Sequence, residues 1–174
     1  MASNLPLTLQ VVVTDHQGSG YSNRVVMGTT QLACDQNLRN VYWALVVDRT
    51  NLNVVENFTF SDNNTIPPKL TQYTTNSQYM LILSSQILLT ASIPAGQFYA
   101  YLLQLGAGPQ LQSIEQFYQT LGCGNWVYLN YTMITVFGSG EAIEYSEYKE
   151  DSVYTLELVP VPATNGVMYT PSLY

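Results

Sequence analysis

The sequence predicts an α/β fold that is rich in β structure: a mixed β-sheet with two amphipathic helices packed on it and an extra N-terminal β layer. Apolar residues alternate with polar ones through much of the first sixty residues, which is typical of strands with one buried face. Two later stretches instead place apolar residues three and four apart, as helices do. Continuous apolar runs lie before and after those stretches, as strands buried on both faces require.

The N-terminal part is expected to form strands. Residues 5–14 alternate leucine and valine with polar or β-branched partners, and the turn-forming residues 15–20 end this strand. Further strands are predicted at residues 24–27, 41–48 and 54–60. Residues 51–53 would form a hairpin between the last two. Phe58 and Phe60 would then share one face of their strand, because side chains alternate with period two.

Two amphipathic helices are predicted at residues 94–105 and 109–121. Each begins with a proline, which is favoured at the first helical position, and each ends before a glycine. A short helix is expected after Pro67 and Pro68, through Tyr73. The apolar stripes of the two longer helices are interpreted as core rather than as a cofactor site.

The remaining elements are strands around and after these helices. They are predicted at residues 79–83, 126–137, 142–145 and 153–159. The strand at 126–137 has two largely apolar faces and should therefore be central. The last residues contain three prolines, Pro160, Pro162 and Pro171, so the tail should be extended and peripheral.

Charge and hydropathy exclude several function classes. Twelve acidic residues oppose five basic ones, for a net charge of −7, and the basic residues are scattered singly. Nucleic-acid binding, which needs clustered Lys and Arg, is therefore not expected. The apolar runs are too short for a membrane-spanning helix. The N-terminus lacks the pattern of a secretory signal peptide, so the compartment stays open between a virion and extracellular space reached by a non-classical route.

Catalytic and metal-binding groups are few. His16 is the single histidine, and the common hydrolase, metalloprotease and phosphate-loop motifs are missing, so we expect neither an enzyme nor a cofactor or metal. Cys34 and Cys123 could form one disulfide or remain two buried thiols. The acidic residues between Glu141 and Asp151 are interpreted as a solvated edge. A calcium site or a glycosidase carboxylate pair, with Glu144 as the residue to test, is the alternative.

Fourteen tyrosines and two tryptophans accompany abundant Asn, Gln, Ser and Thr. Aromatic rings offer faces on which sugar C–H groups stack, and amides bind sugar hydroxyls. The predicted ligand-binding residues are therefore Asn125, Trp126, Tyr128 and Asn130, next to a glycine-flanked turn. The alternative is a structural subunit that self-assembles as a homo-oligomer through β edges and its C-terminal tail.

From Val46 onward the chain resembles the GG-domain family, also called interleukin-like epithelial–mesenchymal-transition inducers. The similarity covers about residues 46–145 and rests on the order and spacing of short segments. The matching segments are Val46-Val47-Asp48-Arg49, Val54-Val55, Phe58-Thr59-Phe60, Tyr79 to Leu83, Pro94 to Ala107, Tyr131 to Gly138, Gly140, and Ile143-Glu144. In place of the arginine that often precedes the equivalent of Tyr131, this chain has Asn130, and no Asp closely follows Leu83.

The resemblance implies a compact fold of β-sheets flanked by helices, without enzymatic activity, and with carbohydrate binding attributed to some members. It divides the single domain 1–174 into an N-terminal β extension (1–45), a GG-like core (46–160) and a peripheral tail (161–174). With the aromatic composition, it leads to the expectation of a lectin-like recognition module. Its partner would be a carbohydrate or glycoprotein surface in a viral, phage, bacterial-surface or toxin system.

Overall fold

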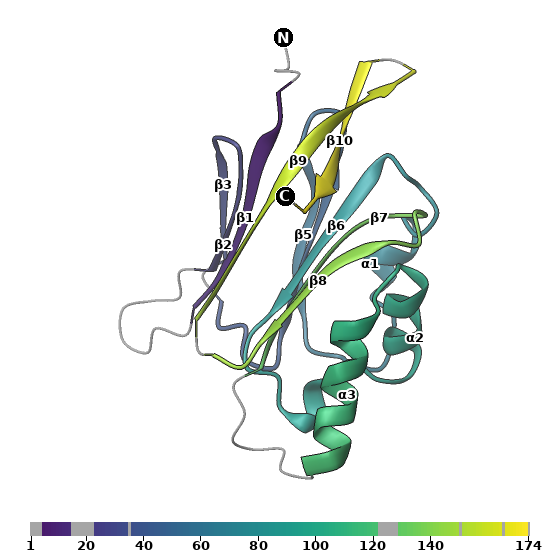
Figure 1. Ribbon diagram of the computed structural model, residues 1–174. Helices are drawn as coiled ribbons and strands as arrows, with labels where there is room; N and C mark the ends of the chain where they lie inside the picture. Colours follow the sequence, from purple (N-terminus) through teal and green to yellow (C-terminus); the bar gives the residue numbers. More distant parts are fainter. Residues whose placement is uncertain are drawn as a thin grey trace.

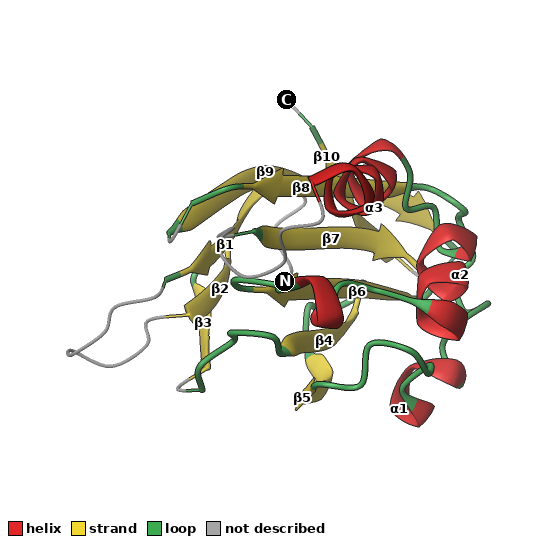
Figure 2. Ribbon diagram, turned by 90° about the horizontal axis from the view of Figure 1, so that it is seen from below, coloured by secondary structure: helices red, strands yellow, loops and turns green. Residues whose placement is uncertain are grey.

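The computed structural model describes residues 5–14, 23–34, 36–121, 129–149, 151–164 and 166–173. In these residues the chain forms two five-stranded sheets and a layer of helices (Figure 1). The second sheet lies in the middle: it packs against the first sheet on one face and against the helices on the other (Figure 2). The β-rich fold class with helices packed on a sheet is confirmed.

The first sheet has the strand order β10-β9-β1-β2-β3. Its strands are β1 (Leu7–Val13), β2 (Asn23–Met27), β3 (Thr30–Cys34), β9 (Ser152–Ala163) and β10 (Gly166–Ser172). In β1 the predicted alternation buries Leu9, Val11 and Val13 against the second sheet. The expected N-terminal β layer is therefore present, but the C-terminal strands β9 and β10 complete it.

The second sheet has the order β5-β4-β6-β7-β8. Its strands are β4 (Tyr42–Asp48), β5 (Val54–Phe60), β6 (Tyr79–Ser85), β7 (Asn130–Val136) and β8 (Ala142–Glu147). Strands β4 and β7 are buried along their whole length, as is β6 after its first residue, because both faces of this sheet are covered. This confirms the prediction that the strands at 79–83 and within 126–137 are buried on both faces.

The helical layer consists of α1 (Pro68–Thr71), the 3₁₀ turn η1 (Thr90–Ser92), α2 (Gly96–Gln104) and α3 (Pro109–Leu121). Both predicted amphipathic helices are present, and α3 has the predicted bounds. Their apolar stripes, including Phe98, Leu102 and Ile114, pack on the second sheet and are core residues, as expected. Helix α2 begins two residues after Pro94, at Gly96.

The expected mixed sheet is not what the strand pairs show. Every pairing between named strands of the described residues is antiparallel, and Arg39 and Gln86 form an isolated parallel bridge. Short connections between neighbouring strands, such as those joining β4 to β5 and β7 to β8, allow antiparallel pairing directly. The two longer helices lie in the connection from β6 to β7, which also pair antiparallel.

The C-terminal tail is extended and lies at a sheet edge, where β10 pairs with the far end of β9. Arg49, which is buried at the end of β4, holds β10 in place. Its Nε donates to the Tyr169 carbonyl (2.7 Å), the Tyr169 N–H donates to the Arg49 carbonyl (2.9 Å), and its Nη2 donates to the Thr170 hydroxyl. Arg49 thus bonds to both backbone groups of Tyr169. Pro160, the residue opposite Tyr169 on β9, therefore does not have to supply the N–H that proline lacks.

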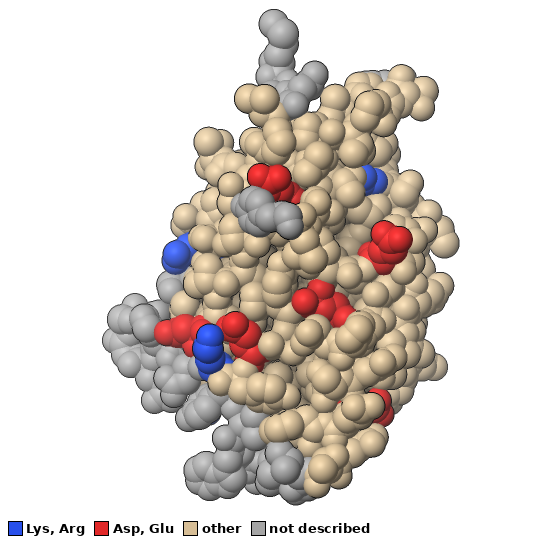
Figure 3. All heavy atoms as spheres, viewed as in Figure 1, with Lys and Arg blue, Asp and Glu red and all other residues tan. Residues whose placement is uncertain are grey.

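No helix among the described residues is long and apolar enough to span a membrane. On the face seen in Figure 3, the charged side chains form small, separate spots on a mostly uncharged surface.

Candidate functional site

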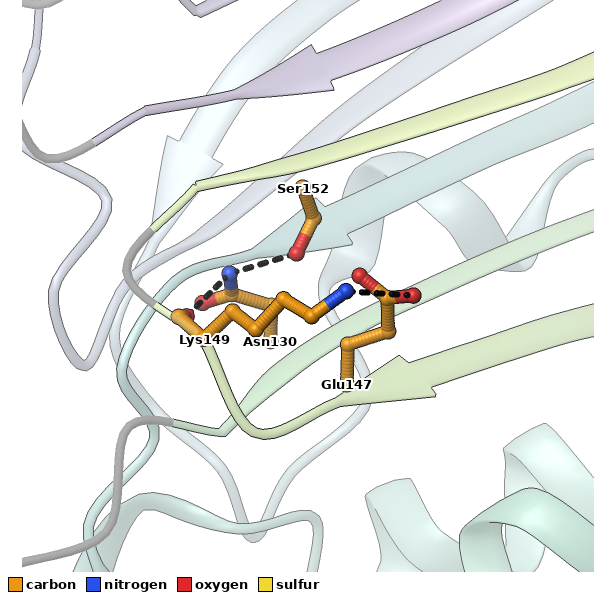
Figure 4. A network of polar contacts seen from close by, with 4 residues as sticks. All are labelled: Asn130, Glu147, Lys149 and Ser152. Carbon is orange, nitrogen blue, oxygen red and sulfur yellow. Dashed lines mark hydrogen bonds and ion pairs between the residues drawn. The ribbon is translucent and has the colours of Figure 1, made fainter.

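Three of the four predicted ligand-binding residues, Asn125, Trp126 and Tyr128, lie outside the described residues, so their positions stay a prediction. The fourth, Asn130, is the first residue of β7 and is fully buried. Its Oδ1 accepts a hydrogen bond from the Ile87 N–H (3.0 Å). Its Nδ2 donates to the Lys149 carbonyl and to the Ser152 hydroxyl, both at 2.8 Å (Figure 4).

Asn130 therefore has a structural task in the described fold. Both amide hydrogens and the amide oxygen are engaged, so the side chain joins the end of β6 to the connection between β8 and β9. Removing such a buried amide would leave several polar groups without partners. The Asn130 amide therefore has no free hydrogen to offer to a ligand.

An aromatic pair joins α3 to the residue that follows β8. Phe117, one helical turn before the end of α3, and Tyr148, just after β8, have ring centroids 4.8 Å apart. Tyr148 is 47% exposed, whereas most large apolar and aromatic side chains of the described chain are buried. An exposed ring thus lies against the last turn of α3.

A second aromatic surface lies on β5, at the free edge of the second sheet. Here the predicted period-two pair Phe58 and Phe60 lines a groove of about 270 Å³. The other lining residues are Asp62, Thr65, Pro67, Pro68 and Lys69. We call this surface the aromatic groove.

The rings of the aromatic groove are held by the core beneath them. Phe60 stacks on Tyr42 at 5.2 Å and contacts Phe98 edge to face at 5.4 Å. Phe58 lies 5.8 Å from Phe60, and the Lys69 ammonium lies 5.0 Å above its ring. Stacking on the buried Tyr42 fixes the orientation of Phe60, and Phe58 packs beside Phe60, so the two rings form one apolar wall.

The polar rim of the groove carries charges of both signs. Asp62 accepts hydrogen bonds from the Asn64 N–H (2.9 Å) and the Thr65 hydroxyl. These donors, the Thr65 hydroxyl first, lower the pKa of the Asp62 carboxyl, which stays ionised. Lys69 pairs with Glu56 at 3.3 Å on the other side. The aromatic wall, with a carboxylate and an ammonium beside it, offers a small ligand both apolar and charged contacts.

The acidic stretch differs from the expected solvated edge at Glu144. This half-buried carboxylate accepts hydrogen bonds from the N–H groups of Gly108 (2.7 Å) and Leu111 (3.3 Å) at the start of α3. It also accepts one from the Tyr131 hydroxyl (2.6 Å). Burial first, and then the Glu144 charge, raises the pKa of Tyr131 well above its ordinary value. Glu144 thus acts as a helix cap supplied by a strand.

The other residues considered for chemistry are accounted for as follows. Glu147 pairs with Lys149 at 3.6 Å (Figure 4). No group of three or more metal-ligating side chains occurs within the described residues. Cys34 is buried in the core between the sheets, while Cys123 and His16 lie outside the described residues.

The core between the two sheets also contains buried hydroxyls. Ser84 on β6 and Thr132 on β7 are cross-strand partners, both almost fully buried, and neither side-chain oxygen has a hydrogen-bond partner in the described part of the chain. In contrast, the Thr135 hydroxyl on the same strand donates to backbone carbonyls. These orphan groups cost stability where they stand.

The chain matches no protein-family model and no curated protein. The resemblance to GG domains therefore stays a prediction, and the function is argued from the geometry.

The aromatic groove was missed as a site from the sequence, although its signal was present. Phe58 and Phe60 were placed on one face of a strand, but the groove also needs α1, which brings Pro68 and Lys69 over that face. An aromatic pair of period two followed by Asp62 and a double proline is the pattern that could have indicated it.

Proposed function

We propose that the chain is a non-enzymatic, lectin-like recognition module that binds carbohydrate in the aromatic groove. The observation that carries the proposal is the combination of two adjacent rings, Phe58 and Phe60, with the ionised Asp62 and with Lys69 around one open groove. The glycan would lie on a cell, virion or glycoprotein surface, as the composition and the resemblance to GG domains suggest.

The chemistry of the groove fits a pyranose ring. The C–H face of a sugar is apolar and lies against an aromatic face, which accounts for the need for Phe58 and Phe60. The hydroxyl groups at the sugar's edge need acceptors and donors, and Asp62, Thr65 and Lys69 offer both at the rim. The volume of about 270 Å³ suits one or two sugar units rather than a long chain.

The groove is reachable because β5 is an edge strand, with β4 on one side and no strand on the other in the described fold. Lys69 is 56% exposed at its side chain, so its position above Phe58 can change when a ligand enters. Breaking the cation–aromatic contact costs about 0.5–1 kcal/mol at such an exposed site, and the new sugar–aromatic contact offsets that cost.

The predicted residues Asn125, Trp126 and Tyr128 remain a second place for a sugar on the same module. The exposed Tyr148 with its neighbour Phe117 supports this second surface, because both flank the end of α3 that leads into residues 122–128. The two surfaces can be separated by mutation.

A glycan array followed by titration of the best ligand tests the proposal. Phe58→Ala is expected to weaken binding about tenfold, since a stacking ring is worth about 0.5–1.5 kcal/mol beyond the area it buries. Val55→Ala, an exposed change three residues earlier on β5, is the matched control and should leave binding unchanged.

Trp126→Ala and Tyr128→Ala complete the set. If these two abolish glycan binding while Phe58→Ala has no effect, the sugar site is the predicted segment and the aromatic groove is rejected. If no glycan binds at millimolar concentration, the lectin-like function is refuted.

Self-assembly through β edges is the second candidate. The edge strand β3 (Thr30–Cys34) favours it, because it contains neither a charged residue nor a proline, two features that normally prevent edge-to-edge pairing. Gln31→Lys would place a charge on that edge. If the original chain forms an oligomer, light scattering would show whether the variant dissociates into monomers. A monomer at high concentration would exclude this candidate.

A further inference from the structure

A second hollow, of about 380 Å³, lies between the N-terminal end of α2 and the C-terminal half of α3. It shares no lining residue with the aromatic groove. Its walls include Ile93, Pro94, Tyr99, Tyr118, Glu115 and Gln119. The hollow therefore brings aromatic and aliphatic surface together with one carboxylate.

Glu115 is the single charged residue of this lining. Its Oε1 accepts a hydrogen bond from the Gln119 amide at 3.2 Å, and its carboxylate lies near the Tyr99 hydroxyl. Burial first, and then this contact with Glu115, raises the pKa of Tyr99. Both partners of the carboxylate are thus neutral groups.

Three other carboxylates of the described chain have a lysine or several N–H groups as partners. Glu56 and Glu147 each pair with a lysine, and Glu144 is bonded to the first N–H groups of α3. No Lys or Arg within the described residues forms an ion pair with Glu115. The negative charge in the hollow is left for a cation from outside.

The walls favour a cation that carries carbon. Tyr99 is half-buried in the hollow. Tyr118 also lines the hollow but is only 4% exposed, and its hydroxyl donates to the Leu88 carbonyl. Aromatic faces attract ammonium groups electrostatically, most strongly where water is partly excluded. The net charge of −7 raises the local concentration of cations in general.

We propose that this hollow binds an organic ammonium group, with its charge against Glu115 and its methyl or methylene groups against Tyr99 and Tyr118. This site is separate from the proposed carbohydrate function and stands if that function fails. A metal ion would not use the aromatic walls, and a neutral apolar ligand would not use Glu115.

Choline and its neutral isostere 3,3-dimethylbutan-1-ol test the site, because they share shape and differ in charge. In a ¹⁵N NMR titration of the full chain, choline should shift the backbone amides of Tyr99, Glu115 and Gln119 saturably. The neutral isostere should bind about fivefold more weakly, as expected for one cation–aromatic and carboxylate contact near the surface. Raising salt from about 0.01 M to about 0.15 M should weaken choline binding only.

The variants separate charge from ring. Glu115→Gln should weaken choline about fivefold and leave the neutral isostere unchanged, whereas Glu56→Gln, a carboxylate outside the hollow, should change neither. Tyr99→Phe keeps the ring and should retain choline binding, while Tyr99→Leu should weaken it. Equal binding of choline and its isostere, shifts that map to another surface, or unchanged choline binding by Glu115→Gln would each overturn the proposal.

Discussion

Replacing Glu144 by alanine should destabilise the fold strongly, although the residue lies in a stretch that reads as a charged surface. The substitution removes three hydrogen bonds at once: those from the Gly108 and Leu111 N–H groups and from the Tyr131 hydroxyl. Helix α3 has Pro109 at its first position and glycine before it, so it has no side-chain cap of its own. Glu144 is its substitute.

The magnitude follows from these contacts. Loss of a helix cap costs about 1 kcal/mol. The hydroxyl of Tyr131, whose side chain is fully buried, would lose its partner at a further cost of about 1–3 kcal/mol. The expected loss in the free energy of unfolding is therefore about 2–4 kcal/mol. Glu141→Ala, three residues earlier and exposed, should cost less than about 0.5 kcal/mol.

Urea unfolding followed by circular dichroism measures both values. A double-mutant cycle with Tyr131→Phe adds a sharper test, because Glu144→Ala should cost about 1 kcal/mol less once the tyrosine hydroxyl is gone. The reasoning would be refuted if Glu144→Ala and Glu141→Ala were equally stable, or if the cycle showed no coupling between Glu144 and Tyr131.

Three further predictions concern the buried polar groups. Thr132→Val removes a hydroxyl that has no hydrogen-bond partner, so it should be neutral or raise the free energy of unfolding by about 1 kcal/mol. Thr135→Val on the same strand removes a bonded hydroxyl and should lower the free energy of unfolding by about 1 kcal/mol. Urea unfolding measures both, and the reverse order would contradict the hydrogen-bond assignment. In Arg49→Lys the lysine has no planar guanidinium with which to bond to β10, so hydrogen exchange at the Tyr169 amide should increase. Unchanged exchange would show that β10 stays in place without Arg49. Burial raises the pKa of Tyr154 to about 12, so this tyrosine loses its proton near pH 10 in the unfolded chain and only at higher pH in the folded chain. The contribution of Tyr154 to stability should therefore be constant below about pH 10 and fall above it. Tyr154→Phe should reduce that fall.

Local elements could be predicted from the sequence because their signals are local. The proline at the start of α3 and the glycine after its end fixed that helix to its observed bounds, and the alternation in residues 5–14 indicated β1. The pairing of β1 with β9 could not be predicted, because the paired residues, such as Leu7 and Leu158, are far apart in the chain. The expected mixed sheet was wrong at the pairing of β6 with β7, which is antiparallel although the two longer helices lie between these strands.

The candidate site shows the same limit. Asn130 was chosen for its residue type, but Ile87, Lys149 and Ser152 occupy its amide, and all three are distant in sequence. The opposite happened at the aromatic groove, where the strand face was predicted and its other wall, from α1, was not. Residue type and period are visible in a sequence, whereas the partners that decide a side chain's task come from tertiary contacts.

Glycan binding by the aromatic groove is the central claim, and one measurement tests it most directly. A ¹⁵N-labelled chain is titrated with the sugar that binds best on an array, and the shifted amides are mapped. Saturable shifts confined to the lining of the groove, from Phe58 to Lys69, are the predicted result. Spectra that stay unchanged at millimolar sugar, or shifts that leave these residues untouched, would contradict the claim.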